Sequence, residues 1–220
     1  MPSSADTSAA RPPKQARGAA RVEALIRAAE GLIVAGGVES MTLSAVARSA
    51  GAAQGTVYRF FPSREALLTT LQERYAAEIE AIVRRALEAF VDRGETAVAH
   101  DVVSVLLWPL ADYYARTPAY SEIRHALSRP GRETAHEARL DAIVVDVLAR
   151  MLRTLAPRLP RARTRLAAAT ILEAGDALVA YGVTAESRAE RRGRLREAEA
   201  MLTGYVEGVT KGRARPGGAG

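Results

Sequence analysis

Residues 41–61 read MTLSAVARSAGAAQGTVYRFF and contain two short helical patterns on either side of a glycine. Thr42 suits the N-cap of the first helix, because apolar residues recur at helical spacing directly after it. Gly51 then interrupts the pattern, and glycine takes the positive φ of a tight turn without penalty. A second helix, over about 53–60, turns Val57 inward. Two short helices joined by a glycine-containing turn predict a helix-turn-helix, whose second helix enters the DNA major groove.

Several side chains of this stretch suit contacts with DNA. Gln54 can pair with an adenine edge and Arg59 with guanine O6 and N7, and each such pair discriminates by about 1–3 kcal/mol. Thr42, Thr56 and Tyr58 carry hydroxyls that suit phosphate oxygens, which set register without reading sequence. We therefore expect base readout at the second helix and phosphate contacts around it.

Three further positions in the second helix bear on the same surface. A glycine inside a helix costs about 1 kcal/mol relative to alanine, and a backbone that must approach a phosphate closely would explain Gly55. Tyr58 and Phe60 are either core aromatics or DNA contacts. Because Tyr58 is offset from the inward stripe of Val57 and Phe61, we favour DNA contact for it.

A longer ordered set of residues runs through this region, namely Thr42, Ala47, Ala50-Gly51, Gly55-Thr56, Tyr58, Phe61-Pro62-Ser63 and Glu65-Ala66-Leu67. With this set, roughly residues 21–71 resemble the DNA-binding segment of the TetR (tetracycline-repressor type) family. The resemblance implies a first helix that braces the two DNA-facing helices. It also implies backbone-contact positions at Thr42, Thr56, Tyr58 and Arg64.

This sequence departs from the family pattern at three positions. Ala53 stands where a serine usually caps the second helix, so a cap and a phosphate contact are lost. Phe60 replaces a tyrosine or histidine and can offer only apolar contact, to a thymine methyl or a sugar. Arg64 replaces a common lysine and keeps the charge. These departures bear on the number of phosphate contacts, and with it on the salt dependence of DNA binding.

Composition narrows the remaining classes of protein. The 220-residue chain has no cysteine, a formal net charge of +6 and a pI near 10, so disulfides and thiolate metal sites are excluded and an anionic partner is favoured. We find no signal peptide and no apolar run approaching 18 residues, and we expect a cytoplasmic protein with no membrane partner. His100, His125 and His136 lack metal-ligand spacing, and no catalytic motif has its expected context. We therefore expect no enzyme, no metal and no cofactor.

We divide the chain into four segments. Residues 1–20 are rich in Ser, Ala and Pro and are expected to be a disordered basic arm, which is either a solvated tail or an arm that reaches phosphates or a minor groove. Residues 21–66 form the helix-turn-helix domain. Residues 67–210 form a ligand-binding and dimerisation domain, and 211–220 a flexible tail.

Periodicity predicts an all-α chain of about nine helices, without strands. Pro109 lies inside the fifth helix and is expected to kink or split it. Beyond the helix-turn-helix, the expected helices cover about 19–35 before it and 64–91, 95–116, 118–128, 133–155, 161–183 and 188–207 after it.

Aromatic residues gather around the fifth and sixth helices. At helical spacing such residues form either a core or a pocket. The family resemblance implies a small-molecule cavity among these helices, with a few polar anchors in a mostly apolar site. The candidate ligand-binding residues are His100, Leu107, Trp108, Tyr113, Tyr114, Arg124, His125, Val144, Glu173 and Asp176.

The helix over 161–183 is apolar nearly all round, so it should be buried on more than one side. We expect it and the last helix to pair with their twofold mates in a homodimer. Glu173 and Asp176 are acids within its apolar middle. They are partners for arginines across the dimer, a receptor for a cationic ligand, or part of a locally exposed edge.

Together these observations predict a homodimeric, ligand-responsive transcriptional regulator, acting as a repressor on a palindromic operator. A helical small-molecule-binding protein with weak or lost DNA binding is the alternative. The sequence does not separate a repressor from an activator.

Overall fold

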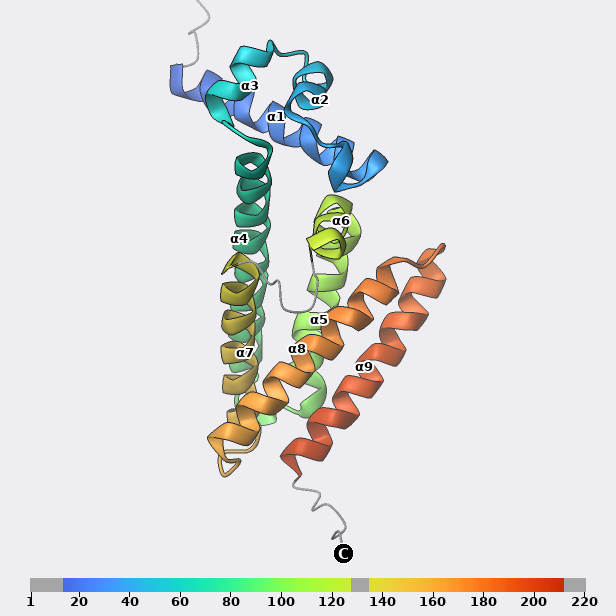
Figure 1. Cartoon of the computed structure of the whole chain (residues 1–220). Helices are drawn as coiled ribbons and strands as arrows, with labels where there is room; N and C mark the ends of the chain where they lie inside the picture. The colour runs from blue at the N-terminus through green and yellow to red at the C-terminus, as the bar shows by residue number, and fades with distance from the viewer. Residues whose placement is uncertain (1–13, 128–134, 212–220) are drawn as a thin grey trace, which may run out of the picture. The chain divides into compact units, whose positions relative to one another are not determined.

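The computed structural model describes residues 14–127 and 135–211, without the side chains of 14–16, 125, 127, 135 and 136. Every regular element in these residues is helical (Figure 1). The chain forms two compact units that divide after Leu71. The α-helices are α1 (Lys14–Gly36), α2 (Leu43–Ser49), α3 (Gln54–Phe60), α4 (Arg64–Val91), α5 (Ala99–Arg116), α6 (Pro118–Leu127), α7 (Ala135–Leu155), α8 (Arg161–Val183) and α9 (Arg188–Thr210).

The first unit contains α1, α2, α3 and the start of α4. Two 3-10 turns complete the helical elements of the described chain, over Val38–Ser40 in this unit and Gly94–Thr96 in the second. Apolar side chains from all four helices meet in one core, since helices this short depend on tertiary packing for their stability. The core residues of this unit are Leu25, Ile26, Ala29, Ile33, Val38, Met41, Leu43, Val46, Ala47, Val57, Phe61, Leu67 and Leu71.

Two expectations about helix boundaries are corrected. Helix α1 begins at Lys14, so residues 14–20 are helical and not disordered. Their sequence, KQARGAA, consists mostly of good helix formers, which extend the helix beyond its amphipathic part. Residues 1–13 lie outside the described set. Helix α5 runs without a break through Pro109, so the proline does not split it. Pro109 is exposed, and the carbonyl that loses its donor can face water.

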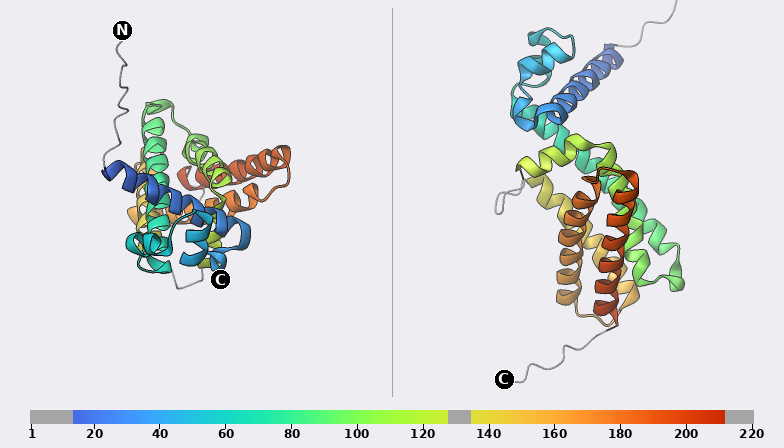
Figure 2. Two further views of the ribbon diagram at one scale, coloured as in Figure 1. Left: turned by 90° about the horizontal axis from the view of Figure 1, so that it is seen from above. Right: turned by 90° about the vertical axis from the view of Figure 1, so that its right-hand side faces the viewer.

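The second unit is a helical bundle in which α8 and α9 lie side by side, as all views in Figures 1 and 2 show. Both helices pack against α5, and α7 packs along α8. Trp108 of α5 donates its indole N–H to Glu199 of α9 at 2.9 Å. At the α8–α9 corner, Gly182 leaves room for Leu195, which would lie only 2.7 Å from a Cβ at that position.

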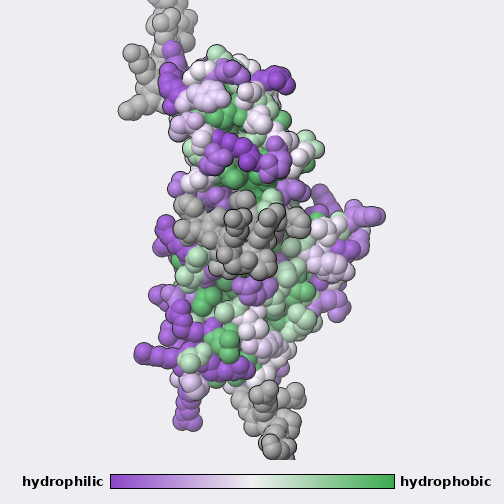
Figure 3. Space-filling model, in the orientation of Figure 1, coloured by the Kyte–Doolittle hydropathy of each residue, from purple (hydrophilic) through white to green (hydrophobic). Residues whose placement is uncertain are grey.

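Helix α8 is the least amphipathic helix of this bundle. By length and composition alone it could cross a membrane, which differs from the expectation that no apolar run approaches the necessary length. Only 28% of its apolar window is buried within the chain. It also carries charged residues at both its start and its middle. On the face shown in Figure 3, hydrophobic and hydrophilic residues are interspersed.

Candidate functional site: a helix-turn-helix face and a helical cavity

The turn between α2 and α3 has the backbone geometry of a helix-turn-helix. Gly51 adopts φ +59°, the left-handed conformation that glycine permits. The amide of Ala52 donates to the carbonyl of Ala47 at 2.9 Å, which closes the turn. Thr42 caps α2 by accepting a hydrogen bond from the amide of Ala45 at 3.1 Å, and its hydroxyl hydrogen remains able to donate outward.

Helix α3 separates its core side from its outer side. Val57 is fully buried, whereas the Tyr58 side chain is 51% exposed. Gln54 and Arg59 are also exposed, and the Arg59 guanidinium lies 4.8 Å from the centre of the Phe60 ring. The outer side of α3 therefore combines an amide, a phenol and a guanidinium, which are the groups that contact DNA bases and phosphates.

The start of α3 lacks the cap that serine would provide. Ala53 occupies the N-cap position and makes no side-chain bond to the helix. Gln54 instead donates from Nε2 to the Ser44 hydroxyl at 2.9 Å, which connects α3 to α2. Sequence reasoning missed Ser44, because the contact spans ten residues and depends on how the two helices cross.

Arg64, expected at a backbone-contact position, is engaged within the protein. Its Nε donates to the carbonyl of Met41 at 3.0 Å and its Nη2 to the carbonyl of Val38 at 2.8 Å. Nη2 also lies 3.3 Å from the carboxylate of Glu39. These bonds tie the start of α4 to the segment that leads into α2.

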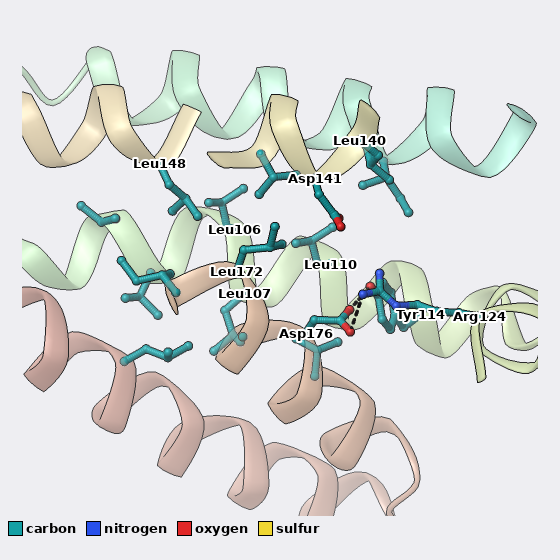
Figure 4. Close-up of a pocket in the computed structure, with 18 of the residues that line it drawn as sticks. Leu106, Leu107, Leu110, Tyr114, Arg124, Leu140, Asp141, Leu148, Leu172 and Asp176 are labelled. Carbon is teal, nitrogen blue, oxygen red and sulfur yellow. Dashed lines mark hydrogen bonds and ion pairs between the residues drawn. The ribbon is translucent and has the colours of Figure 1, made fainter. Parts of the chain in front are cut away.

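The second unit contains a mostly apolar cavity enclosed by α4, α5, α6, α7, α8 and α9 (Figure 4). Its volume is about 70 Å³. Five of the candidate ligand-binding residues line it, namely Leu107, Tyr114, Arg124, Val144 and Asp176. The structure thus brings together residues from four different helices.

One end of the cavity is polar. Arg124 of α6 forms an ion pair with Asp176 of α8 at 2.7 Å, and Tyr114 of α5 donates its hydroxyl to the same carboxylate at 2.6 Å. Arg124 also donates to the Tyr120 hydroxyl at 3.1 Å. Burial, together with the neighbouring Tyr120 and Asp176, raises the pKa of Tyr114 well above its ordinary value, so the phenol stays protonated and donates.

The other candidate ligand residues lie outside this cavity. His100 and Trp108 both contact Glu199 of α9, at 3.3 Å and 2.9 Å. Tyr113 is buried in an aromatic cluster with Tyr75, Tyr114 and Tyr120. Glu173 is exposed on α8. The side chain of His125 is outside the described residues.

Two polar residues of the cavity were not among the candidates for it. Tyr120 belongs to the aromatic run that the sequence shows, but it was not chosen. Asp141 also lines the cavity. In the sequence, the signal that could have identified it is an acid next to the apolar stripe of α7. A stripe alone does not say which flanking polar residue turns inward. Among residues 14–127 and 135–211, no cluster of three His, Cys, Asp or Glu side chains suits a metal ion.

The fold and this face define a two-part helical protein with an N-terminal helix-turn-helix. Residues 25–71 match the family model described as bacterial regulatory proteins, tetR family. Residues 99–205 match the model described as tetracyclin repressor-like, C-terminal domain. The chain belongs to the TetR family of transcriptional regulators, with a DNA-binding helix-turn-helix domain and a C-terminal ligand-binding domain.

Solved structures show the same fold at low sequence identity. A fatty acid degradation regulator, FadR, from Bacillus halodurans is 19% identical with a TM-score of 0.62, covering 84% of this chain and 95% of that one. A TetR-family regulator from Streptomyces coelicolor is 20% identical with a TM-score of 0.61, covering 86% and 99%. A TetR-like regulator from Rhodococcus sp. RHA1 is 15% identical with a TM-score of 0.63, covering 92% and 100%. No curated protein matches the sequence.

Proposed function

We propose that this protein is a ligand-responsive repressor that binds a palindromic DNA operator as a homodimer and is released by a small-molecule effector. The outer side of α3 carries this proposal. Gln54, Tyr58 and Arg59 are exposed above a buried Val57. Gln54 and Arg59 are assigned to base edges, and Thr42, Thr56 and Tyr58 to phosphates. The protein works in the cytoplasm, where it meets DNA.

The homodimer is assigned to α8 and α9. Leu166 and Tyr181 of α8 and Met201 of α9 expose more than half of their side-chain surface, and burial against a second copy would remove this apolar area from water. A Cβ at Gly193, or at Gly204, would have no described atom within 4 Å, so a second helix can approach closely. The exposed carboxylate of Glu173 is assigned to an arginine of the second copy.

The effector is assigned to the cavity of the second unit. Binding there can change DNA affinity only if the effector prefers one of two conformations, with a coupling free energy of typically about 1–3 kcal/mol. The continuous helix α4, which begins in the first unit and ends in the second, is the covalent route for this coupling.

A second candidate is a ligand-binding protein with weak DNA binding, and the uncapped start of α3 at Ala53 favours it. Selection of duplexes from a randomised pool by the full-length protein, at about 150 mM salt to weaken nonspecific binding, separates the two functions. Enrichment of a palindrome supports the repressor and supplies its operator. A dimer that enriches no sequence contradicts it and favours the second candidate.

A further inference from the structure

The polar end of the cavity is already neutralised by the protein itself. Arg124 and Asp176 are paired at 2.7 Å, and their side chains are only 26% and 20% exposed. In Figure 4, Arg124, Tyr114 and Asp176 meet at one end of the cavity. The rest of its lining includes Leu106, Leu107, Leu148 and Leu172. A ligand therefore meets an apolar space closed by a satisfied ion pair.

A charged ligand would have to break this pair. A ligand carboxylate that pairs with Arg124 leaves Asp176 charged and poorly hydrated. A ligand amine that pairs with Asp176 leaves Arg124 charged and poorly hydrated. Removing one partner from a buried pair is strongly unfavourable, because the other charge loses its compensation. Asp141 also lines the cavity, and it too is engaged with another group.

An uncharged oxygen can bind without breaking the pair. Arginine has five N–H donors. The described bonds of Arg124 use Nη1 toward Tyr120 and Nη2 toward Asp176. The remaining N–H directions can donate to a carbonyl or hydroxyl oxygen while the ion pair stays closed.

We propose that the effector is an uncharged, mainly apolar molecule with a hydroxyl or carbonyl oxygen, and that the Arg124–Asp176 ion pair excludes carboxylates and amines of the same size. This proposal rests on the assignment of the effector to the cavity. The selectivity is a property of the pair, so neutralising either member changes which ligand charge is accepted.

Three probes with one six-carbon chain test this proposal, namely 1-hexanol, hexanoate and hexylamine, titrated into the full-length protein by calorimetry at neutral pH. We expect saturable binding of hexanol, at least tenfold tighter than binding of either ion. Asp176→Asn frees the charge of Arg124, so hexanoate should gain at least tenfold relative to hexanol. Arg124→Gln should give hexylamine the same advantage.

Asp146→Asn is the matched control, because it removes a carboxylate from an exposed ion pair with Arg165 on the surface of the same bundle. It should keep the ranking of the unmodified protein. Equal or tighter binding of an ion by the unmodified protein overturns the proposal, and so does failure to bind any probe. If either pair variant loses its helical circular dichroism, the other variant and the ranking of the unmodified protein still decide. These titrations do not measure operator binding. A failure of the proposed repressor function would therefore appear separately, in the duplex selection.

Discussion

Arg64 donates from Nε to the carbonyl of Met41 at 3.0 Å, which connects the first residue of α4 to the residue just before the N-cap of α2. A second bond reaches Val38 at 2.8 Å. Hydrogen bonds from a charged donor contribute about 1.5–3 kcal/mol. This arginine is therefore a brace of the helix-turn-helix, although the family pattern suggests a phosphate contact at the same position.

Replacing Arg64 with alanine should lower the free energy of unfolding of the first unit by about 1.5–3 kcal/mol, measured by denaturant titration. Arg48→Ala is the control, since Arg48 is exposed at the end of α2 and should change stability by about 0.5 kcal/mol or less. The salt dependence of operator binding should keep its slope in the Arg64 variant. A slope reduced by about 0.9 would instead identify a phosphate contact.

Gly55→Ala should separate stability from DNA binding. A Cβ at this position would have no described atom within 4 Å, so nothing in the protein itself requires glycine. Alanine should raise the free energy of unfolding by up to about 1 kcal/mol. It should also weaken operator binding, because in the proposed complex the added methyl group would face the DNA backbone. Gly31→Ala, equally uncrowded in α1, should raise stability and leave operator affinity unchanged. Unaltered affinity in the Gly55 variant would remove this position from the DNA interface.

Gly182→Ala should destabilise the corner between α8 and α9. The new Cβ would lie 2.7 Å from Cδ2 and 3.0 Å from Cγ of Leu195, and Leu195 is buried. Overpacking of this kind costs about 1–3 kcal/mol, and the gain in helix propensity offsets about 1 kcal/mol of it. Gly175→Ala in the same helix meets only an ordinary contact at 3.8 Å. In thermal unfolding, the Gly182 variant should melt below the Gly175 variant; the opposite order would show that Leu195 moves freely.

Leu166→Glu should weaken the homodimer, because it places a charge in the apolar surface assigned to the interface. Sedimentation velocity should show dissociation at protein concentrations at which the unmodified protein remains dimeric. Val34→Glu is the control, since Val34 is a comparably exposed apolar residue on α1 and lies outside the assigned interface. Retention of the dimer by the Leu166 variant would move the interface away from this part of α8.

The protein should lose stability above about pH 10. Burial, followed by the charge of Glu78, raises the pKa of Tyr113, whereas in the unfolded chain a tyrosine ionises near pH 10. Above that pH the unfolded state binds fewer protons, so stability that is present below pH 10 falls as pH rises, by about 1.4 kcal/mol per pH unit for each such tyrosine. Tyr113→Phe should reduce the loss of stability measured by denaturant titration between pH 10 and 11 by about 1 kcal/mol, because an unfolded tyrosine is only half ionised at pH 10. An unchanged slope would contradict the effect of burial.

Local sequence determined the helix-turn-helix. N-cap chemistry at Thr42, the positive φ of Gly51 and the inward position of Val57 depend on neighbours only a few residues away, and the structure confirms all three. The bounds of α4 and α8 also follow from local signals, because Pro62 and Pro160 each stand just ahead of a helix start. Helical periodicity and caps act within one or two turns, so they are visible in the chain itself.

Tertiary structure alone decided which polar groups meet. Arg124 and Asp176 are separated by more than fifty positions and lie on different helices, and either acid of α8 was an equal candidate in the sequence. The packing of α8 turns Asp176 into the cavity and leaves Glu173 exposed. In the same way, Arg64 became a brace because the fold brings the carbonyls of Val38 and Met41 within its reach. Such contacts depend on how helices cross, which periodicity along a single helix does not encode.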